Sequence, residues 1–437
     1  MNPSLLTFVV SLATAVLAAP VVACLCQRLG IVDRPDGHRK LHATAVPLTG
    51  GPTITISVVL AILATLFFFP NALLDSKGDF RFLVALSCAS AIIVMVGILD
   101  DRIGLRGRQK LLGQFVAAAI MLPSGIQIRS VVLLGYPIEF GDLSIVVTLF
   151  WILGAINSLN LIDGVDGLAS TTGIVLSLSV AAVTFISGGR PDGLLISLAL
   201  AGALCGFLVY NFPPARMFLG DSGSMLIGLI LGCVALKCSV KQYTAVALIL
   251  PTAIWAIPIF DSAMAIVRRR LTGRSIYATD RGHLHHCLVR RGHTGGRLLL
   301  VVASLCGITG AGAIASATFQ NDLIAITAVL TAFALLVVTR SFGHAELTLL
   351  TNRVRRFIGS LLRRLEGPKP LLHHEQVRLQ GKHEWDEVWQ ILTEFAEQHD
   401  LDCVELMVNL PSIGEEYHAT WRTKSNVEQH EAWRTEI

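Results

Sequence analysis

The sequence contains few charged and few aromatic residues. Charged side chains occupy 15% of its 437 positions and aromatic ones 7%, whereas hydrophobic residues occupy 53%. Soluble domains carry about 25% charged residues. The net charge of +4 is too small to indicate a nucleic-acid partner, so none is expected. The composition therefore predicts a protein whose main surroundings are the lipid bilayer.

Motifs typical of several enzyme classes are missing. The nine cysteines form no CxxC pair and mostly lie within apolar runs, which predicts small core residues rather than metal ligands. Neither a GxxxxGK[ST] nor an HExxH sequence occurs. A P-loop ATPase and a zinc enzyme are therefore not indicated.

Long apolar runs fill the first 340 residues. A helix needs roughly 20 mainly apolar residues to cross the hydrocarbon with its backbone polar groups satisfied. No Lys or Arg precedes the first run, so we expect a retained helix rather than a cleaved signal peptide. About eleven spans are predicted, over Ser4–Cys26, Thr53–Phe69, Phe82–Leu99, Leu111–Ile126, Leu143–Ile156, Leu168–Ile186, Leu194–Tyr210, Ser224–Leu236, Ala245–Val267, Leu298–Ala315 and Leu323–Val338.

Lys and Arg are unevenly distributed among the loops between these runs. With eleven spans, seventeen of them fall on one side and six on the other. The side with more basic residues is expected to be cytoplasmic. Every polar motif described below also falls on that side. The alternative is that the basic loops are topology signals only.

The composition changes after Arg340. Residues 341–370 are expected to form a basic amphipathic linker on the membrane surface. Gln376–Gln380 and Val404–Asn409 alternate like strands, and Glu384–His399 has helical periodicity. The predicted fold is thus an all-α polytopic membrane protein, with a transmembrane catalytic domain over 1–340 and a small cytoplasmic α/β tail domain over 371–437.

The most specific polar motif is NSLNLIDGVDGLAS. Asn157, Asn160 and Asp163 are three residues apart and are expected to share a helix face at the membrane boundary, with Asp166 beyond them. Polar groups in such a place are costly unless they bind something. The alternative is a polar turn in which glycines end and start helices.

Two further acidic motifs lie where spans meet the cytoplasm. Paired carboxylates at Asp100 and Asp101 either hold a hard cation or raise one another's pKa, and an interfacial charge cluster is the alternative. In FLGDSGS, Asp221 precedes an apolar run, where Asp221 or Ser222 is suited to capping a helix. As a third acidic position on the same side, Asp221 also suits an Mg²⁺ ligand.

Two basic loops are suited to anions. Their histidines and arginines favour contacts to a pyrophosphate over a metal site, and an interfacial basic loop is the alternative. The residues concerned are Lys40 and His42 in the first loop, and Arg269, His283, His285 and His286 in DRGHLHHCLVRRGH and the arginines before it.

Taken together and in this order, these motifs resemble those of the bacterial polyprenyl-phosphate N-acetylhexosamine-1-phosphate transferases of glycosyltransferase family 4. The resemblance covers roughly residues 28–340. The HLHH form is more similar to the UDP-N-acetylglucosamine branch than to the UDP-MurNAc-pentapeptide branch, whose loop has three adjacent histidines. The resemblance implies undecaprenyl phosphate as acceptor, a UDP-N-acetylhexosamine as donor, UMP as product, Mg²⁺ or Mn²⁺ as cofactor, and the bacterial cytoplasmic membrane as location.

The resemblance also implies residue roles. Asp100, Asp101, Asp163 and Asp166 are expected to be catalytic, and Asp221 with Asp101 to bind the metal. Substrate-binding roles are expected for Lys40, His42, Asn157, Asn160, Arg269, His283, His285 and His286.

Several alternatives stay open from the sequence. Direct displacement with Asp100 as base is favoured, and a covalent aspartyl-phosphate is its rival. The runner-up enzyme is the phospho-MurNAc-pentapeptide transferase of peptidoglycan synthesis. A secondary transporter is the main non-enzyme alternative, although its polar residues should lie near mid-span rather than at the ends of spans. A homodimer is a further expectation.

Overall fold

The computed structural model describes most of the membrane region and parts of the tail. Lys40 and His42, together with most of the linker expected over 341–370, lie outside the described residues. The chain divides into two units, Met1–Ala263 with Leu288–Leu335, and Met264–Cys287 with Leu336–Ile437. The described residues are 2–34, 45–70, 77–133, 136–189, 191–241, 245–246, 248–271, 282–344, 347–348, 351, 354–355, 373–380, 385–399, 401, 403–410 and 415–422.

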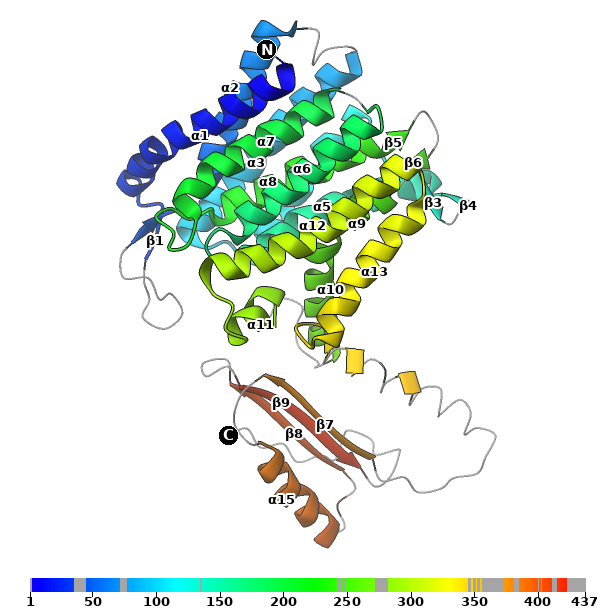
Figure 1. The fold of residues 1–437 in the computed structure, drawn as a ribbon. Coiled ribbons are helices and arrows are strands. Elements are labelled where there is room, and N and C mark those ends of the chain that lie inside the picture. Colours follow the sequence, from blue (N-terminus) through cyan, green and yellow to red (C-terminus); the bar gives the residue numbers. More distant parts are fainter. Residues whose placement is uncertain are drawn as a thin grey trace. The chain divides into compact units, whose positions relative to one another are not determined.

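Helices build the first unit (Figure 1). Within the described residues, eight helices are long and apolar enough to cross a membrane, which confirms the polytopic all-α fold. Helices α10, α11 and α13 each cross a boundary between the units. The helices are α1 (Pro3–Arg28), α2 (Gly50–Phe68), α3 (Lys77–Ile103), α4 (Gly107–Met121), α5 (Ser144–Ile162), α6 (Leu168–Ile186), α7 (Pro191–Asn211), α8 (Gly220–Ser239), α9 (Ile249–Ile254), α10 (Ala256–Leu271), α11 (Leu284–Arg290), α12 (Gly295–Phe319) and α13 (Asp322–Val338).

Three of the expected spans are not single helices of membrane-crossing length. Helices α4 and α13 have 15 and 17 residues. The run expected over Ala245–Val267 is divided into α9 and α10, and its first two residues belong to a strand. Pro258 explains the division, because proline has no N–H to donate and its ring crowds the carbonyl four residues earlier. That carbonyl belongs to Ile254, where α9 ends.

Helix α8 is the most enclosed of the spanning helices. In its most apolar window 83% of the residues are buried, against 28% in α1 and in α3. Close backbone contact makes this possible at its first turn. A Cβ on Gly97 of α3 would lie 2.2 Å from the Cα of Ser222, so only glycine fits at this crossing. The start of α8 is therefore held tightly against α3.

Short strands connect the helices of the first unit. Strands β1 (Val32–Asp33) and β2 (Val46–Pro47) pair antiparallel between α1 and α2. A second sheet has the order β4-β3-β6-β5. Its strands are β3 (Ser130–Leu133), β4 (Tyr136–Glu139), β5 (Val240–Lys241) and β6 (Ala245–Val246).

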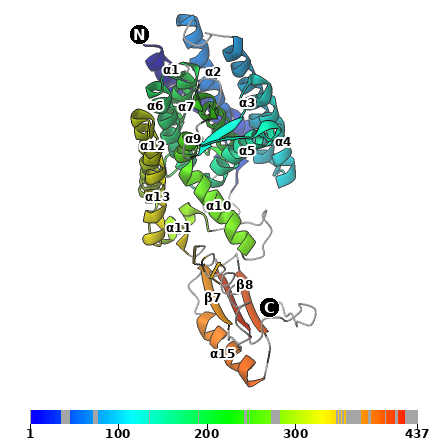
Figure 2. The same cartoon turned by 90° about the vertical axis from the view of Figure 1, so that its right-hand side faces the viewer.

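The tail is a three-stranded antiparallel sheet with one helix, α15 (Trp385–Gln398), on its face (Figure 2). Strands β7 (His373–Gln380), β8 (Cys403–Leu410) and β9 (Glu415–Arg422) have the order β7-β9-β8. Trp389 of α15 is buried with Tyr417, Ala419 and Trp421 of β9. The small α/β tail is thus confirmed. Strand β9 was missed, although its buried residues alternate along the chain as in a strand with one buried face.

Candidate active site

Asp101 joins α3 to the start of α8. One carboxylate oxygen accepts a hydrogen bond from the Asp221 N–H at 2.8 Å, and the other accepts from the Ser222 N–H at 3.3 Å and the Ser222 hydroxyl at 3.0 Å. A carboxylate at the first turn also interacts favourably with the helix dipole. A Cβ on Gly220 would lie 2.7 Å from this carboxylate, which explains glycine there. The cap expected from Asp221 or Ser222 is thus supplied by Asp101 of another helix.

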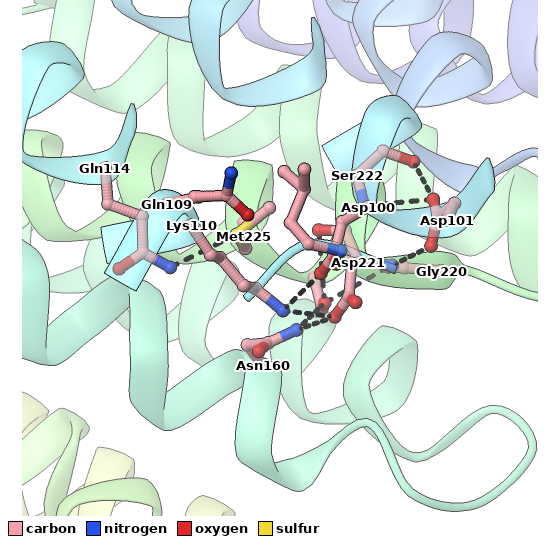
Figure 3. Close-up of polar contacts among 12 residues, drawn as sticks. Asp100, Asp101, Gln109, Lys110, Gln114, Asn160, Gly220, Asp221, Ser222 and Met225 are labelled. Carbon is pink, nitrogen blue, oxygen red and sulfur yellow. Dashed lines mark hydrogen bonds and ion pairs between the residues drawn. The ribbon is translucent and has the colours of Figure 1, made fainter. Parts of the chain in front are cut away.

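Asp101 bonds to the backbone of Asp221. The Asp221 side chain contacts Lys110 instead, and Lys110 also contacts Asp100 (Figure 3). The Lys110 Nζ of α4 lies 2.9 Å from an oxygen of Asp100 and 2.9 Å from an oxygen of Asp221. The Leu105 N–H donates to the other oxygen of Asp100 at 2.7 Å. One ammonium group therefore bridges two carboxylates from helices α3 and α8.

Asn160 of α5 completes this group. Its side-chain N–H₂ donates to Asp221 and, at 3.0 Å, to the hydroxyl of Ser224. Residues of α3, α4, α5 and α8 thus meet around Asp221, at the end of the bundle where α3 and α5 finish and α4 and α8 begin. The carboxylates of Asp100 and Asp221 lie close to the Lys110 ammonium and the Asn160 amide. These groups form a polar site rather than a packed core.

Asn157 lies one turn earlier on α5 and bonds to α4 instead. Its side chain donates to the Gln114 carbonyl at 2.7 Å, while the Gln114 amide donates to Asn157 at 3.3 Å and lies 3.2 Å from the Met225 sulfur. Gln114 is buried. This reciprocal pair fixes α4 against α5, so Asn157 orients the site through packing contacts in this structure, and its expected substrate contact stays a prediction.

Asp163 and Asp166 follow the end of α5. Asp163 is the C-cap residue of α5, and burial, aided by the nearby carboxylates of Asp221, Asp101 and Asp166, raises its pKa well above the ordinary value. An Asp166 oxygen accepts a hydrogen bond from the Ala215 N–H at 2.9 Å. Asp163 therefore lies near the acidic cluster, whereas Asp166 binds the loop before α8 through the Ala215 N–H.

The loop before α8 is also bound to the segment directly before α2, at whose start Gly50 and Gly51 lie. The Phe218 N–H donates to Pro47 at 3.0 Å, and the Thr49 N–H donates to Phe218 at 3.0 Å. The two loop motifs expected to contribute to the site are thus joined by backbone hydrogen bonds.

The expected histidine group lies in the second unit. His283 and His285 are buried, with nearly parallel rings 5.8 Å apart, and the His285 and His286 rings are 4.2 Å apart. Arg268, also buried, donates to the Gly282 carbonyl at 2.8 Å. The structure thus gathers the three histidines beside the end of α10, where Arg269 also lies.

The acidic cluster of Asp100, Asp101 and Asp221 offers part of the ligand set of a Mg²⁺ ion. Among the residues that the structure describes, no group of three or more His, Cys, Asp or Glu side chains is arranged to hold a metal ion alone. Asp221 and Asp100 nevertheless present carboxylates to one cationic group, Lys110. Mg²⁺ usually takes one or two carboxylates plus substrate phosphates. The donor set therefore fits a cation that is completed by substrate.

Lys110 and Gln114 are the residues that the sequence interpretation missed. Both are polar residues in the first half of α4, where Lys110 lies in the first turn and Gln114 one turn later. The tight connection over 104–106 between α3 and α4 was the available signal, because it returns the chain beside Asp100.

Comparisons with known proteins identify the family of this chain. The family model described as glycosyl transferase family 4 matches residues 83–239, which include most of α3 and all of the helices from α4 to α8. A Bacillus subtilis protein named probable undecaprenyl-phosphate N-acetylglucosaminyl 1-phosphate transferase is 35% identical over 68% of this chain and 80% of its own length. This chain belongs to glycosyl transferase family 4.

Two other members show the range of the family. A Mycobacterium tuberculosis protein named decaprenyl-phosphate N-acetylglucosaminephosphotransferase is 34% identical over 69% of this chain and 79% of its own length. A Shouchella clausii protein named phospho-N-acetylmuramoyl-pentapeptide-transferase is 30% identical over 65% of this chain and 89% of its own. Both branches considered from the sequence are thus represented among the relatives.

Proposed function

We propose that this enzyme transfers N-acetylglucosamine-1-phosphate from UDP-N-acetylglucosamine to undecaprenyl phosphate, giving undecaprenyl-diphosphate-N-acetylglucosamine and UMP. The observation that carries the proposal is the convergence of Asp100, Lys110 and Asp221 at the end of the bundle. Two phosphate-bearing substrates repel each other, and a group of ion-binding carboxylates with an ammonium is suited to bringing them together.

In the proposed reaction an oxygen of the lipid phosphate attacks the phosphorus that carries the sugar. The bond from that phosphorus to the UMP oxygen breaks, and UMP leaves. Asp100 accepts the proton if the lipid phosphate arrives protonated, and Lys110 holds the Asp100 carboxylate in place at 2.9 Å. Direct displacement is the proposed route, and a covalent aspartyl-phosphate is its rival.

Asp221 and Asp100 would hold Mg²⁺, or Mn²⁺ in its place, together with substrate phosphate oxygens. A metal held by these residues would supply charge neutralisation to the phosphates. Asp101, as cap of α8, positions Asp221 for this role. Direct metal binding by Asp101 is a further part of the proposal.

The donor is proposed from the relatives. Relatives named as N-acetylglucosamine phosphate transferases are 31–35% identical over 65–70% of this chain. Two relatives named phospho-N-acetylmuramoyl-pentapeptide-transferase are 30% identical over 65% of it and 33% identical over 50% of it. Arg269, the three histidines, Lys40 and His42 are proposed to contact the donor. The basic side of the membrane domain, and with it the active face and the tail, is proposed to be cytoplasmic in the bacterial inner membrane. A homodimer is a further proposal.

The test is UMP release by the purified protein in detergent with undecaprenyl phosphate and Mg²⁺. We expect release with UDP-N-acetylglucosamine and only background with UDP-MurNAc-pentapeptide. Release with the pentapeptide donor alone would move the enzyme to peptidoglycan synthesis. Absence of release with either donor from folded protein would reject the proposed donor and leave a different donor sugar or a transporter to be tested.

A further inference from the structure

Helix α15 of the tail has two apolar faces. One face is buried against the sheet through Trp389, with partly buried Leu392 beside it. The other face consists of Val388, Ile391 and Phe395, which are 42%, 67% and 52% exposed. Spacings of three and four residues place these three side chains in one stripe along the helix. We call this set the α15 stripe.

The α15 stripe is a contiguous row of exposed apolar side chains. Exposed apolar side chains scattered singly are ordinary, but a row of them on one helix marks a binding surface. The spacing is that of the a and d positions of a coiled coil, in which a partner helix covers the seam. A helix is therefore the partner shape that fits the stripe.

The charge on α15 decides which helix fits. Its charged residues are Asp386, Glu387, Glu394 and Glu397, with no Lys or Arg among its residues. Glu387 and Glu394 are exposed and each directly precedes a stripe residue, at the g positions of the coiled-coil repeat. A second α15 or an anionic bilayer would bring like charge to this edge, whereas Arg or Lys side chains would pair with it.

We propose that the α15 stripe is a docking surface for a basic amphipathic helix of a partner protein. The partner covers Val388, Ile391 and Phe395 with apolar side chains and places Arg or Lys opposite Glu387 and Glu394. The docking surface lies in the tail, and the proposal does not depend on the transferase reaction.

The test uses the full-length protein in nanodiscs of phosphatidylcholine, a lipid without net charge. The probe is a fluorescent synthetic peptide of about three heptads with Leu at a and d and Arg at e and g. A matched peptide has Glu in place of every Arg. Anisotropy at low and high salt reports binding. We expect the basic peptide to bind at least about tenfold more tightly than the acidic one, with the difference reduced by salt.

Three variants separate the parts of the surface. Ile391→Ser with Phe395→Ser should weaken binding of the basic peptide at least about tenfold. Glu387→Lys with Glu394→Lys should reverse the preference, so that the acidic peptide binds better. Glu397→Lys, a charge reversal away from the stripe, is the control and should leave the preference for the basic peptide. All these side chains are exposed, and limited proteolysis of the tail checks that each variant is folded.

Equal binding of the two peptides, or unchanged preference in the Glu387→Lys, Glu394→Lys variant, would overturn the proposal. The chain's own arginine-rich segment is a competing occupant. If replacing Arg353, Arg355 and Arg356 by Glu raises the affinity for the basic peptide, that segment covers the stripe and the partner-protein proposal is wrong. Unchanged affinity in that variant supports a separate partner.

Discussion

The two ends of helix α8 both carry charged residues in a spanning helix, but in different balance. At its start, Asp221 meets the carboxylates of Asp100 and Asp101 and the ammonium group of Lys110. At its other end, Lys237 forms an ion pair with Asp192 of α7. That pair has one charge of each sign, whereas the start of α8 has an excess of negative charge.

The difference separates a binding site from a structural contact. Asp192 is buried, Lys237 is largely enclosed, and the lysine lies 4.0 Å from the centre of the Phe82 ring, so the pair is satisfied within the protein. Acidic groups in excess stay costly until another cation arrives. Charges inside a spanning region therefore indicate a ligand when they do not balance locally.

The largest expected effect on turnover is that of Asp221→Ala. This change removes the carboxylate that contacts both Lys110 and Asn160, so we expect UMP release to fall by about 10³-fold at ordinary Mg²⁺. Initial rates of UMP release in detergent measure it. Near-normal activity in this variant would show that the unbalanced end is not the site.

Lys110→Met is expected to lower turnover by about 10²-fold. It removes the ammonium that holds Asp100 and Asp221 together but keeps an unbranched side chain that is one atom shorter. The maximum rate under saturating substrates is the measurement. Lys241→Met, at the other end of the bundle, is the control, and an equal loss in both variants would contradict a specific role of Lys110.

The Mg²⁺ concentration for half-maximal rate should depend on pH, with a change of about tenfold or less across the titration of Asp163. Because the pKa of Asp163 is raised, its carboxyl keeps a proton at pH values where an ordinary Asp is ionised, and a cation nearby must displace that proton. The Mg²⁺ concentration for half-maximal rate should therefore rise as pH falls through this raised pKa. In Asp163→Asn we expect the dependence to flatten, and an unchanged pH profile in that variant would assign it to another group.

Lys237→Met should have the smallest effect on turnover. It leaves Asp192 as an uncompensated buried charge, which typically costs about 3–5 kcal/mol of stability. We expect a lower unfolding temperature in detergent but an unchanged rate per folded molecule. A shift of the Mg²⁺ optimum in this variant would make the balanced end part of the site.

Much of the fold was legible in the sequence because apolar length is a direct physical requirement of the bilayer. The division at Trp255 was not, since the apolar run continues through Pro258 and only the lost backbone hydrogen bond marks the break. Asp100, Asp221 and Asn160 were found because acidic and amide groups are conspicuous at the ends of spans.

The partners of these residues were harder to predict. Lys110 looked like one of several basic residues in a loop, and its pairing with Asp221 depends on how α4 packs against α3 and α5. Asp101 had the same signal as Asp100, yet its carboxylate caps α8. Such roles depend on contacts between segments distant in the sequence, which local spacing does not contain.

The central claim is that the acidic cluster is the metal and phosphate site. Its most direct test is to measure Mn²⁺ binding to the purified protein by electron paramagnetic resonance with UDP-N-acetylglucosamine present. The account predicts that the wild type and Lys237→Met bind the ion equally and that Asp221→Ala loses it. Equal Mn²⁺ binding by Asp221→Ala and the wild type would contradict the assignment of the acidic cluster as the metal and phosphate site.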